Sequence, residues 1–255
     1  MIFVTGDTHA DFRRFSTSNF PDQKEMTKDD IVIICGDFGG VWSESPEERH
    51  WLDWLNEKPF TTLFVDGNHE NFDRLNSNEF DEINYCGGRV HKIRDNVLHL
   101  MRGYVFELQG KKFFCFGGAS SHDIRDGILD PDDFSNHRAF KKEYWRRYIV
   151  GEQFRVKGYS WWPQELPNEA EMIRGKESLS KHGWKVDYVV THCLPQEVVA
   201  AFSMGLYEPD VVTTYFNQLL RDDLQFSHWY CGHYHMNRRI MGKFDVLYDD
   251  IVRIE

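Results

Sequence analysis

The sequence predicts an α/β fold in which parallel strands carry flanking helices, and two observations lead to this prediction. A strand, a helix and a strand follow one another over residues 31–35, 46–56 and 61–66, an order that implies parallel pairing with a right-handed crossover. Apolar runs such as IVIICGD (31–37) end abruptly in Gly, Asp or His, as buried strands of a parallel sheet do. With 255 residues, of which 41% are hydrophobic, the chain can form one large domain or two small ones, and we favour one domain over 1–255.

The first half of the chain is expected to supply the main sheet. Buried strands are predicted at 1–6, 31–35 and 61–66. Ser45-Pro46-Glu47-Glu48 has the pattern of a capping box with Pro at the first helical position, which predicts a helix over 46–56. The periodicity then changes, and residues 89–116 have the pattern of short strands with turns at 94–96 and 109–110. We therefore expect a second, antiparallel-rich sheet there.

The second half begins with the least regular part of the sequence. An acidic loop is followed by a basic, aromatic-rich segment at 137–157, and we expect a cap-like insertion over 117–183. Asn168 with Glu171 three residues later predicts a helix over 169–181 that stops at Gly183. The remaining predicted elements are a strand at 186–190, an amphipathic helix at 209–223, a strand at 228–231 and a terminal hairpin that turns at Gly242-Lys243.

Composition narrows the function classes. A net charge of −11 argues against broad electrostatic binding to nucleic acid or to anionic membranes, although bound divalent cations would still allow an anionic substrate. No apolar run approaches the ~20 residues that cross a bilayer, and the chain opens directly into a strand without a secretory signal. Five cysteines without a CxxC pair argue against a disulfide framework and a thiolate zinc site. We therefore expect a cytoplasmic protein without membrane contact.

Metal-binding side chains follow five of the apolar runs. They occur in Asp7-Thr8-His9, Gly36-Asp37, Gly67-Asn68-His69-Glu70, the single His192, and Gly232-His233-Tyr234-His235. Carboxylate, amide and imidazole groups without thiolate suit Mn, Fe, Zn or Ni. Two metal ions about 3.5–4 Å apart need a shared anionic ligand, and Asp37 is the natural bridge.

This ordered set of motifs resembles the calcineurin-like metallophosphoesterase superfamily, and the resemblance covers residues 6–235. It implies a four-layer α/β/β/α sandwich of two mixed sheets, with two divalent ions, Mn²⁺ first among the candidates and Fe, Zn or Ni as the others. One ion would take Asp7, His9, Asp37 and His235, and the second would take Asp37, Asn68, His192 and His233. The implied reaction is hydrolysis of a phosphate mono- or diester, with metal-bound hydroxide as nucleophile and His69 as the acid that protonates the leaving oxygen.

Departures from the superfamily pattern limit the substrate class. The protein Ser/Thr phosphatase branch carries Gly-Asp-x-x-Asp-Arg, whereas this chain has Phe38, Gly39, Gly40 and Val41 after Asp37. The carboxylate that would orient the acid histidine and the arginine that would hold phosphate are therefore absent. The chain resembles the small stand-alone bacterial and phage members instead, and Asp11 and Glu70 are the two candidates for orienting His69.

The substrate stays open between a phosphorylated small molecule, a nucleotide and a nucleic acid. Nuclease activity is the main alternative to a general phosphoesterase, and a non-catalytic metal-binding scaffold is the third hypothesis. The segment 137–157 is either a platform for nucleotides or single strands, or a helix whose aromatic residues face the core and whose basic face is solvated or paired with the acidic loop. Candidate substrate contacts are His122, Arg74 and Trp161.

Three cysteines lie within two residues of proposed ligands, namely Cys35, Cys193 and Cys231. Thiolate coordination is one interpretation. Small buried hydrophobic residues are the interpretation we favour, because neighbours along a strand point in opposite directions.

Overall fold

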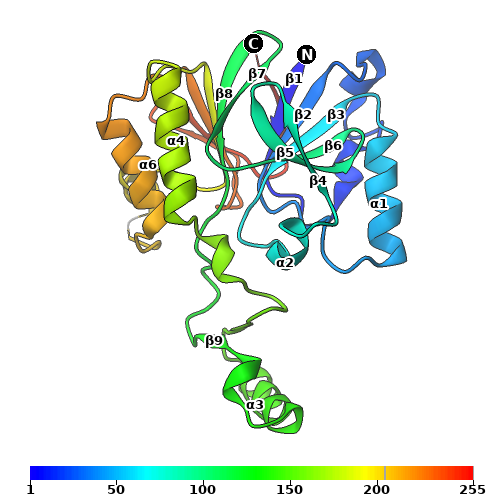
Figure 1. The fold of residues 1–255 in the computed structure, drawn as a ribbon, viewed down its shortest axis with the longest axis vertical. Helices are drawn as coiled ribbons and strands as arrows, with labels where there is room; N and C mark the ends of the chain where they lie inside the picture. The colour runs from blue at the N-terminus through cyan, green and yellow to red at the C-terminus, as the bar shows by residue number, and fades with distance from the viewer. Residues whose placement is uncertain (204, 255) are drawn as a thin grey trace.

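The computed structural model describes residues 1–203 and 205–254, and within them two sheets lie face to face (Figure 1). The first sheet has the strand order β15-β1-β2-β3-β6-β5-β4, and the second has the order β13-β14-β12-β11-β8-β7. The strands of the first sheet are β1 Ile2–Thr5, β2 Ile31–Cys35, β3 Thr61–Val65, β4 Asp81–Tyr85, β5 Gly88–Arg94, β6 Val97–Leu100 and β15 Ile251–Ile254. Those of the second are β7 Tyr104–Leu108, β8 Lys111–Phe116, β11 Tyr188–Thr191, β12 His228–Cys231, β13 Arg238–Ile240 and β14 Phe244–Val246.

Helices cover the outer faces of the two sheets. They are α1 Pro46–Asn56, α2 Phe72–Leu75, α3 His137–Val150, α4 Glu169–Lys181, α5 Gln196–Ser203 and α6 Val211–Arg221, with 3₁₀ helices at Phe12–Phe15, Pro21–Glu25, Pro131–Asp133 and Pro163–Glu165. In Figure 1, α1 lies outside the first sheet, and α4 and α6 lie outside the second. None of the described helices is long and apolar enough to cross a membrane, and a cytoplasmic location stays a prediction.

Three buried clusters hold these layers together. Side chains such as Ile33 and Leu63 meet Phe113 and Val190 between the two sheets. A second cluster packs α1 on the first sheet, and a third packs α4, α5 and α6 on the second. The four-layer α/β/β/α sandwich is therefore confirmed. Because each sheet is buried on both faces, its central strands read as continuous apolar runs.

The pairing of the strands brings the five motif-bearing strand ends together. β1, β2 and β3 are parallel to one another, and β11 is parallel to both β8 and β12. The carboxyl ends of these strands thus lie on the same edge of each sheet. At this edge a Cβ on Gly67 would lie 2.0 Å from Oδ1 of Asp37, and one on Gly232 would lie 2.0 Å from Oδ1 of Asp7. Only glycine permits so close an approach.

Several predicted elements are confirmed with their signals. The Ser45 side chain accepts the Glu48 N–H at the start of α1, whose bounds are those predicted. Asn168 and Glu171 form a capping box at the start of α4, which also has its predicted bounds. The strand β12 and the amphipathic helix α6 lie where they were expected.

One predicted arrangement was wrong, and another is confirmed in part. Residues 89–116 do not form a separate sheet, because β6 pairs in parallel with β3 and so extends the first sheet, whereas β7 and β8 belong to the second. The chain passes between the sheets at Gly103, which has a φ of 84°. The terminal hairpin is formed by β13 and β14 around Gly242, but β15 leaves it and pairs antiparallel with β1.

The segment from β9 (Ile128–Leu129) through α3 to β10 (Arg155–Val156), which we call the arm, projects away from the sandwich (Figure 1). Its own small cluster consists of Leu129, Phe140 and Val156. The expectation that its aromatic residues face a core is confirmed only in part. Phe140 belongs to this cluster, and Tyr144 and Phe154 pack against it. The Trp145 and Tyr148 side chains, in contrast, are 54% and 62% exposed. The two-stranded sheet of β9 and β10 packs against α3 at Phe140 and leaves these two side chains uncovered.

The pairing of this region with the acidic loop is confirmed in part. Arg155 pairs with Asp123, and Lys157 Nζ lies 2.5 Å from Asp130. α4, which the expected insertion over 117–183 also included, packs against β7 in the sandwich. The cap role of 117–183 stays a prediction. The single domain over 1–255 also stays a prediction, and residues 204 and 255 lie outside the described part.

Candidate metal centre

The first predicted ligand set converges at the ends of β1, β2 and β12. Nε2 of His235 lies 3.2 Å from Oδ2 of Asp7 and 3.2 Å from Nε2 of His9. Nε2 of His9 in turn lies 3.9 Å from Oδ2 of Asp7 and 3.8 Å from Oδ2 of Asp37. Four side chains from three strand ends therefore direct ligand atoms toward a common point.

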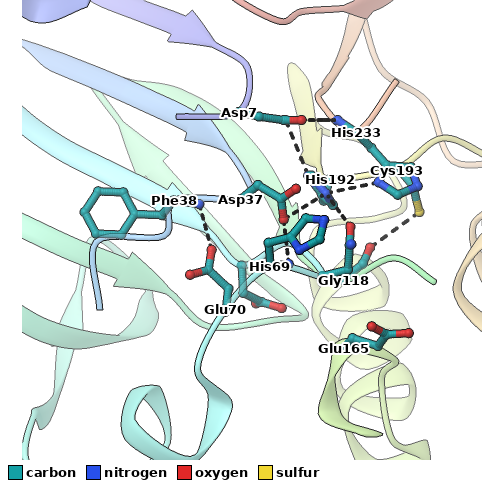
Figure 2. A network of polar contacts seen from close by, with 12 residues as sticks. Asp7, Asp37, Phe38, His69, Glu70, Gly118, Glu165, His192, Cys193 and His233 are labelled. Carbon is teal, nitrogen blue, oxygen red and sulfur yellow. Dashed lines mark hydrogen bonds and ion pairs between the residues drawn. The ribbon is translucent and has the colours of Figure 1, made fainter. Parts of the chain in front are cut away.

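The second set lies on the other side of Asp37. Nε2 of His192 lies 3.3 Å from Oδ1 of Asp37, 3.1 Å from Oδ1 of Asn68 and 3.2 Å from Nδ1 of His233. Figure 2 shows Asp37 beside His192 and His69. Since Oδ1 faces one set and Oδ2 faces the other, Asp37 is placed as the bridge would be.

The charges at this edge fit a cation. Asp7 and Asp37 are each only 1% exposed, and all their ion-pair partners within the described residues are histidines. Burial opposes ionisation of Asp37, but the adjacent His192 and its hydrogen bond hold the pKa of Asp37 below its ordinary value. Two buried carboxylates without Lys or Arg need another source of positive charge.

The four ligand imidazoles differ in the direction of their pKa shifts. Burial lowers the pKa of His9 and that of His233, which favours the neutral ring that coordinates metals. Burial opposes protonation of His192, but the carboxylate of Asp37 raises the pKa of His192, and that of Asp7 raises the pKa of His235. His192 Nδ1 lies 2.8 Å from the Cys35 carbonyl oxygen, to which it can donate, so its Nε2 is directed to the centre. The residues present therefore fit two divalent ions. In two groups, Asp7 with His9 and His235, and Asp7 with Asp37 and His192, all ligand atoms lie within 4.8 Å of one another. Asp7 therefore lies close to both ligand sets.

Backbone strain accompanies the same residues. Asp37, His9, His233 and His235 all have positive φ, at 45°, 45°, 69° and 47°. The left-handed region is unfavourable for residues with a Cβ, and such strain persists where the surrounding structure enforces it. Its concentration at four of the seven predicted ligands marks this edge as a functional site.

A second layer of polar residues, which the sequence did not reveal, supports the ligands. The Asn68 amide donates to Oγ of Ser121 at 3.3 Å, and that hydroxyl donates to Oε2 of the buried Glu165 at 2.6 Å. Asp66 binds His99 at 3.1 Å and forms a buried ion pair with Arg102 beneath the same loop. Ser121 and Glu165 lie 44 residues apart in irregular segments, so no local pattern indicates their contact.

His69 lies at the mouth of the centre. Its backbone N–H donates to Oδ1 of Asp37 at 2.8 Å, and its ring centroid lies 5.5 Å from that of His9 (Figure 2). Burial holds the pKa of His69 below its ordinary value, although Asp37 and Asp123 oppose this shift. A negatively charged substrate at the centre would raise this pKa, as an acid role requires.

The two candidates for orienting His69 contact other groups. Glu70 accepts the Phe38 and Gly39 N–H groups at 2.7 and 3.2 Å, and Asp11 binds Arg13. Glu70 thereby fixes the loop that follows Asp37. Burial, with Asp37 nearby, raises the pKa of Glu70 to about 8.

The three candidate substrate residues lie in different surroundings. Nε2 of His122 is 2.5 Å from Nε2 of His233, so His122 is at the centre. Arg74 binds Glu48 and Glu79 at 2.6 and 2.5 Å, which engages its guanidinium with protein carboxylates. Trp161 lies after β10. Burial raises the pKa of Glu165, and the Trp161 indole acts in the opposite direction on that pKa. Substrate contact by these residues stays a prediction.

The cysteines near the ligands behave as small hydrophobic residues. Cys35, Cys193 and Cys231 are at most 1% exposed, and burial raises the pKa of each thiol well above its ordinary value. Cys193 Sγ lies 3.4 Å from the Gly118 carbonyl oxygen (Figure 2). Neutral buried thiols are poor metal ligands.

Comparison with known proteins agrees with this geometry. The chain matches the family model described as calcineurin-like phosphoesterase over residues 1–237. It is similar to lariat debranching enzyme A of Xenopus laevis, with 27% identity over 150 residues, covering 52% of this chain and 26% of the relative. The lariat debranching enzyme of Homo sapiens is 27% identical over 145 residues, covering 51% and 25%. That of Gallus gallus is 26% identical over 172 residues, covering 61% and 30%.

The matched part amounts to between 25% and 30% of the length of these relatives. The family model, in contrast, covers most of this chain and includes every residue of both ligand sets. The chain therefore belongs to the calcineurin-like phosphoesterase family.

Proposed function

We propose that this chain hydrolyses phosphodiesters at a centre of two divalent ions that share Asp37. The observation that carries the proposal is the placement of Asp37, whose two carboxylate oxygens face two separate groups of ligands. Asp7, His9 and His235 would complete one ligand set, and Asn68, His192 and His233 the other. Two bound divalent ions supply an acidified water and the positive charge that stabilises a phosphoryl transition state.

The residues of the chain perform the remaining tasks. Asp37 would hold both ions, and by accepting the His69 N–H it fixes the loop that carries His69. His69 donates its proton to the leaving oxygen, since its side chain lies beside His9 at the opening of the centre. Ser121 holds the Asn68 amide by accepting its N–H, so the amide oxygen stays directed toward His192.

A diester is preferred over a monoester for two reasons. The relatives are named for debranching lariats, which is phosphodiester chemistry. Segment 137–157 also carries seven Lys and Arg against two Glu, in a chain whose net charge is −11. This local excess of positive charge favours a substrate with further phosphates, so nuclease activity is the second candidate.

The test is hydrolysis of bis-p-nitrophenyl phosphate and p-nitrophenyl phosphate by the chelator-treated chain, resupplied separately with Mn²⁺, Fe²⁺, Zn²⁺ and Ni²⁺. We expect Mn²⁺ to give the highest activity and the diester to have the larger kcat/KM. Activity on neither ester, with two ions bound per chain, would contradict the proposal and favour a non-catalytic scaffold. A larger kcat/KM for the monoester would overturn the diester assignment alone.

A further inference from the structure

A cavity of about 600 Å³ opens beside the metal centre. It shares His9 and His69 with that centre, so a group held in the cavity would adjoin the reacting phosphate. We propose, on the basis of the function proposed above, that this cavity is a subsite for the heterocyclic base of a nucleotide unit attached to the scissile phosphate. Its volume lies in the range of pockets that enclose small organic ligands.

Aromatic side chains form the apolar walls. Phe12, Trp42 and Trp51 all line the cavity. The Trp42 ring meets Trp162 at 88°, with 5.5 Å between centroids, and the Trp51 ring meets Trp54 at 84° and 5.3 Å. These edge contacts fix the planes of two half-buried indoles that line one cavity. Fixed indoles of this kind favour stacking with planar bases.

Polar groups on the same walls distinguish a base from other aromatic ligands. Glu47, in the first turn of α1, lines the cavity and makes no hydrogen bond or ion pair within the described residues. An unpaired carboxylate favours a ligand with N–H donors, such as the amino group of adenine or cytosine, and repels a second anionic group. Glu48 is not available for this role, because it accepts the Trp42 and Ser43 N–H groups and pairs with Arg74.

The arm contributes a cation to the cavity. Arg155, at the start of β10, lines it together with His69. Arg155 is held by Asp123 from the acidic loop. It supplies from a distant element the positive charge that residues 38–41 lack, and it is placed to meet the phosphate that links the base to the centre.

Competitive inhibition tests this subsite. Adenosine 5′-monophosphate and ribose 5-phosphate carry the same sugar and phosphate, and only the first carries a base. With bis-p-nitrophenyl phosphate as the reporter substrate, we expect the inhibition constant of the nucleotide to be at least about tenfold lower, as one stacked base would give. Trp42→Ala should reduce the preference to below about threefold, and Trp42→Phe should restore most of it.

Trp184→Ala is the control. Trp184 is also partly buried, but it packs against the cluster between the second sheet and its helices and does not line the cavity. This variant should keep the full preference. Equal inhibition constants in the unmodified chain, or a preference that survives both Trp42→Ala and Trp51→Ala, would overturn the subsite. Either result still shows ester hydrolysis, whereas failure of the proposed function would leave no hydrolysis to inhibit.

Discussion

The metal centre and the arm are built in opposite ways. At the centre, ligands from both sheets meet on strand ends that are fixed by three large buried clusters. The arm is held by three buried residues and by ion pairs at the surface, and its helix α3 exposes Trp145 and Tyr148. Yet Arg155 of the arm reaches the cavity beside His69.

This difference in packing assigns catalysis to the centre and substrate preference to the arm. Positions fixed by a packed core keep catalytic geometry, because a displaced ligand there would disturb two sheets at once. A projecting segment with its own small cluster can change its sequence without disturbing the sandwich. We therefore expect changes at the centre to abolish activity and changes in the arm to alter which ester is preferred.

The largest contrast is expected between two carboxylates, one in each region. Asp37→Asn should lower kcat/KM by at least about 10⁴-fold, because both ions lose their shared anionic ligand. Glu143→Gln in α3, which breaks ion pairs with Arg146 and Arg147, should change it by less than about twofold. Elemental analysis should show fewer than two ions per chain in Asp37→Asn only. Full metal content in that variant would contradict the bridging role.

Two buried phenylalanines compare the stability of the regions. Phe64 is fully buried in β3 and stacks on Phe38 with 4.0 Å between centroids, so Phe64→Ala should cost about 3–5 kcal/mol of unfolding free energy. Phe140→Ala should loosen only the arm, because its cluster is separate from the other three. Calorimetry should show a lowered main transition in Phe64→Ala alone, and hydrogen exchange should show faster exchange of α3 in Phe140→Ala. A comparable loss in both variants would mean that the arm folds with the sandwich.

The sequence predicted the centre better than the arm, for physical reasons. A buried parallel strand must be apolar along its length, so Asp37 and His192 stand out at the strand ends as the polar exceptions. Capping side chains act within four residues, and α1 and α4 were therefore predicted with their bounds. The ligand sets were proposed from the resemblance, and the structure brings their side chains together.

Other features depend on contacts between distant segments. β5 and β6 have the pattern of an antiparallel pair, but only the pairing of β6 with β3 decides which sheet they join. Trp145 is exposed because the two-stranded sheet of β9 and β10 packs against α3 only around Phe140. Aromatic residues in a helix normally predict a covered face. Nothing local links Ser121 to Asn68 or places Arg155 beside His69.

Ser121 lies where the two regions meet, since the loop that carries it leads from β8 toward the arm. Ser121→Ala removes the acceptor for the Asn68 amide and leaves the buried carboxylate of Glu165 with one hydrogen bond fewer. We expect metal affinity to fall about 10–100-fold, as loss of a group that orients a ligand does. Ser121→Thr keeps the hydroxyl and should restore most of the affinity, measured by titration calorimetry with Mn²⁺. Unchanged affinity in Ser121→Ala would show that Asn68 is held by other contacts.

The smallest expected effect is a difference in acid sensitivity. Burial, with His99 beside it, lowers the pKa of His91 to about 4 from an ordinary value of 6.5, and His91 Nδ1 lies 3.0 Å from Nδ1 of His99 behind Asp66. The unfolded chain therefore binds the proton first on acidification, so the stability that His91 contributes is complete above pH 6.5 and is lost as pH falls toward 4.

This loss has a slope of up to about 1.4 kcal/mol per pH unit. The pKa of Glu143 in the arm is lowered to about 2 by hydrogen bonds from Arg146 and Arg147, so its contribution is lost only below its ordinary value of 4.5. Urea unfolding at pH 6.5 and 5.0 should show a smaller difference in His91→Asn than in the unmodified chain, while Glu143→Gln should leave the difference unchanged. Equal differences in all three proteins would mean that acid sensitivity in this window arises elsewhere. A smaller stability difference between the two pH values in Glu143→Gln would instead show that the arm contributes to the stability of the sandwich. That result would contradict the independence of the two regions.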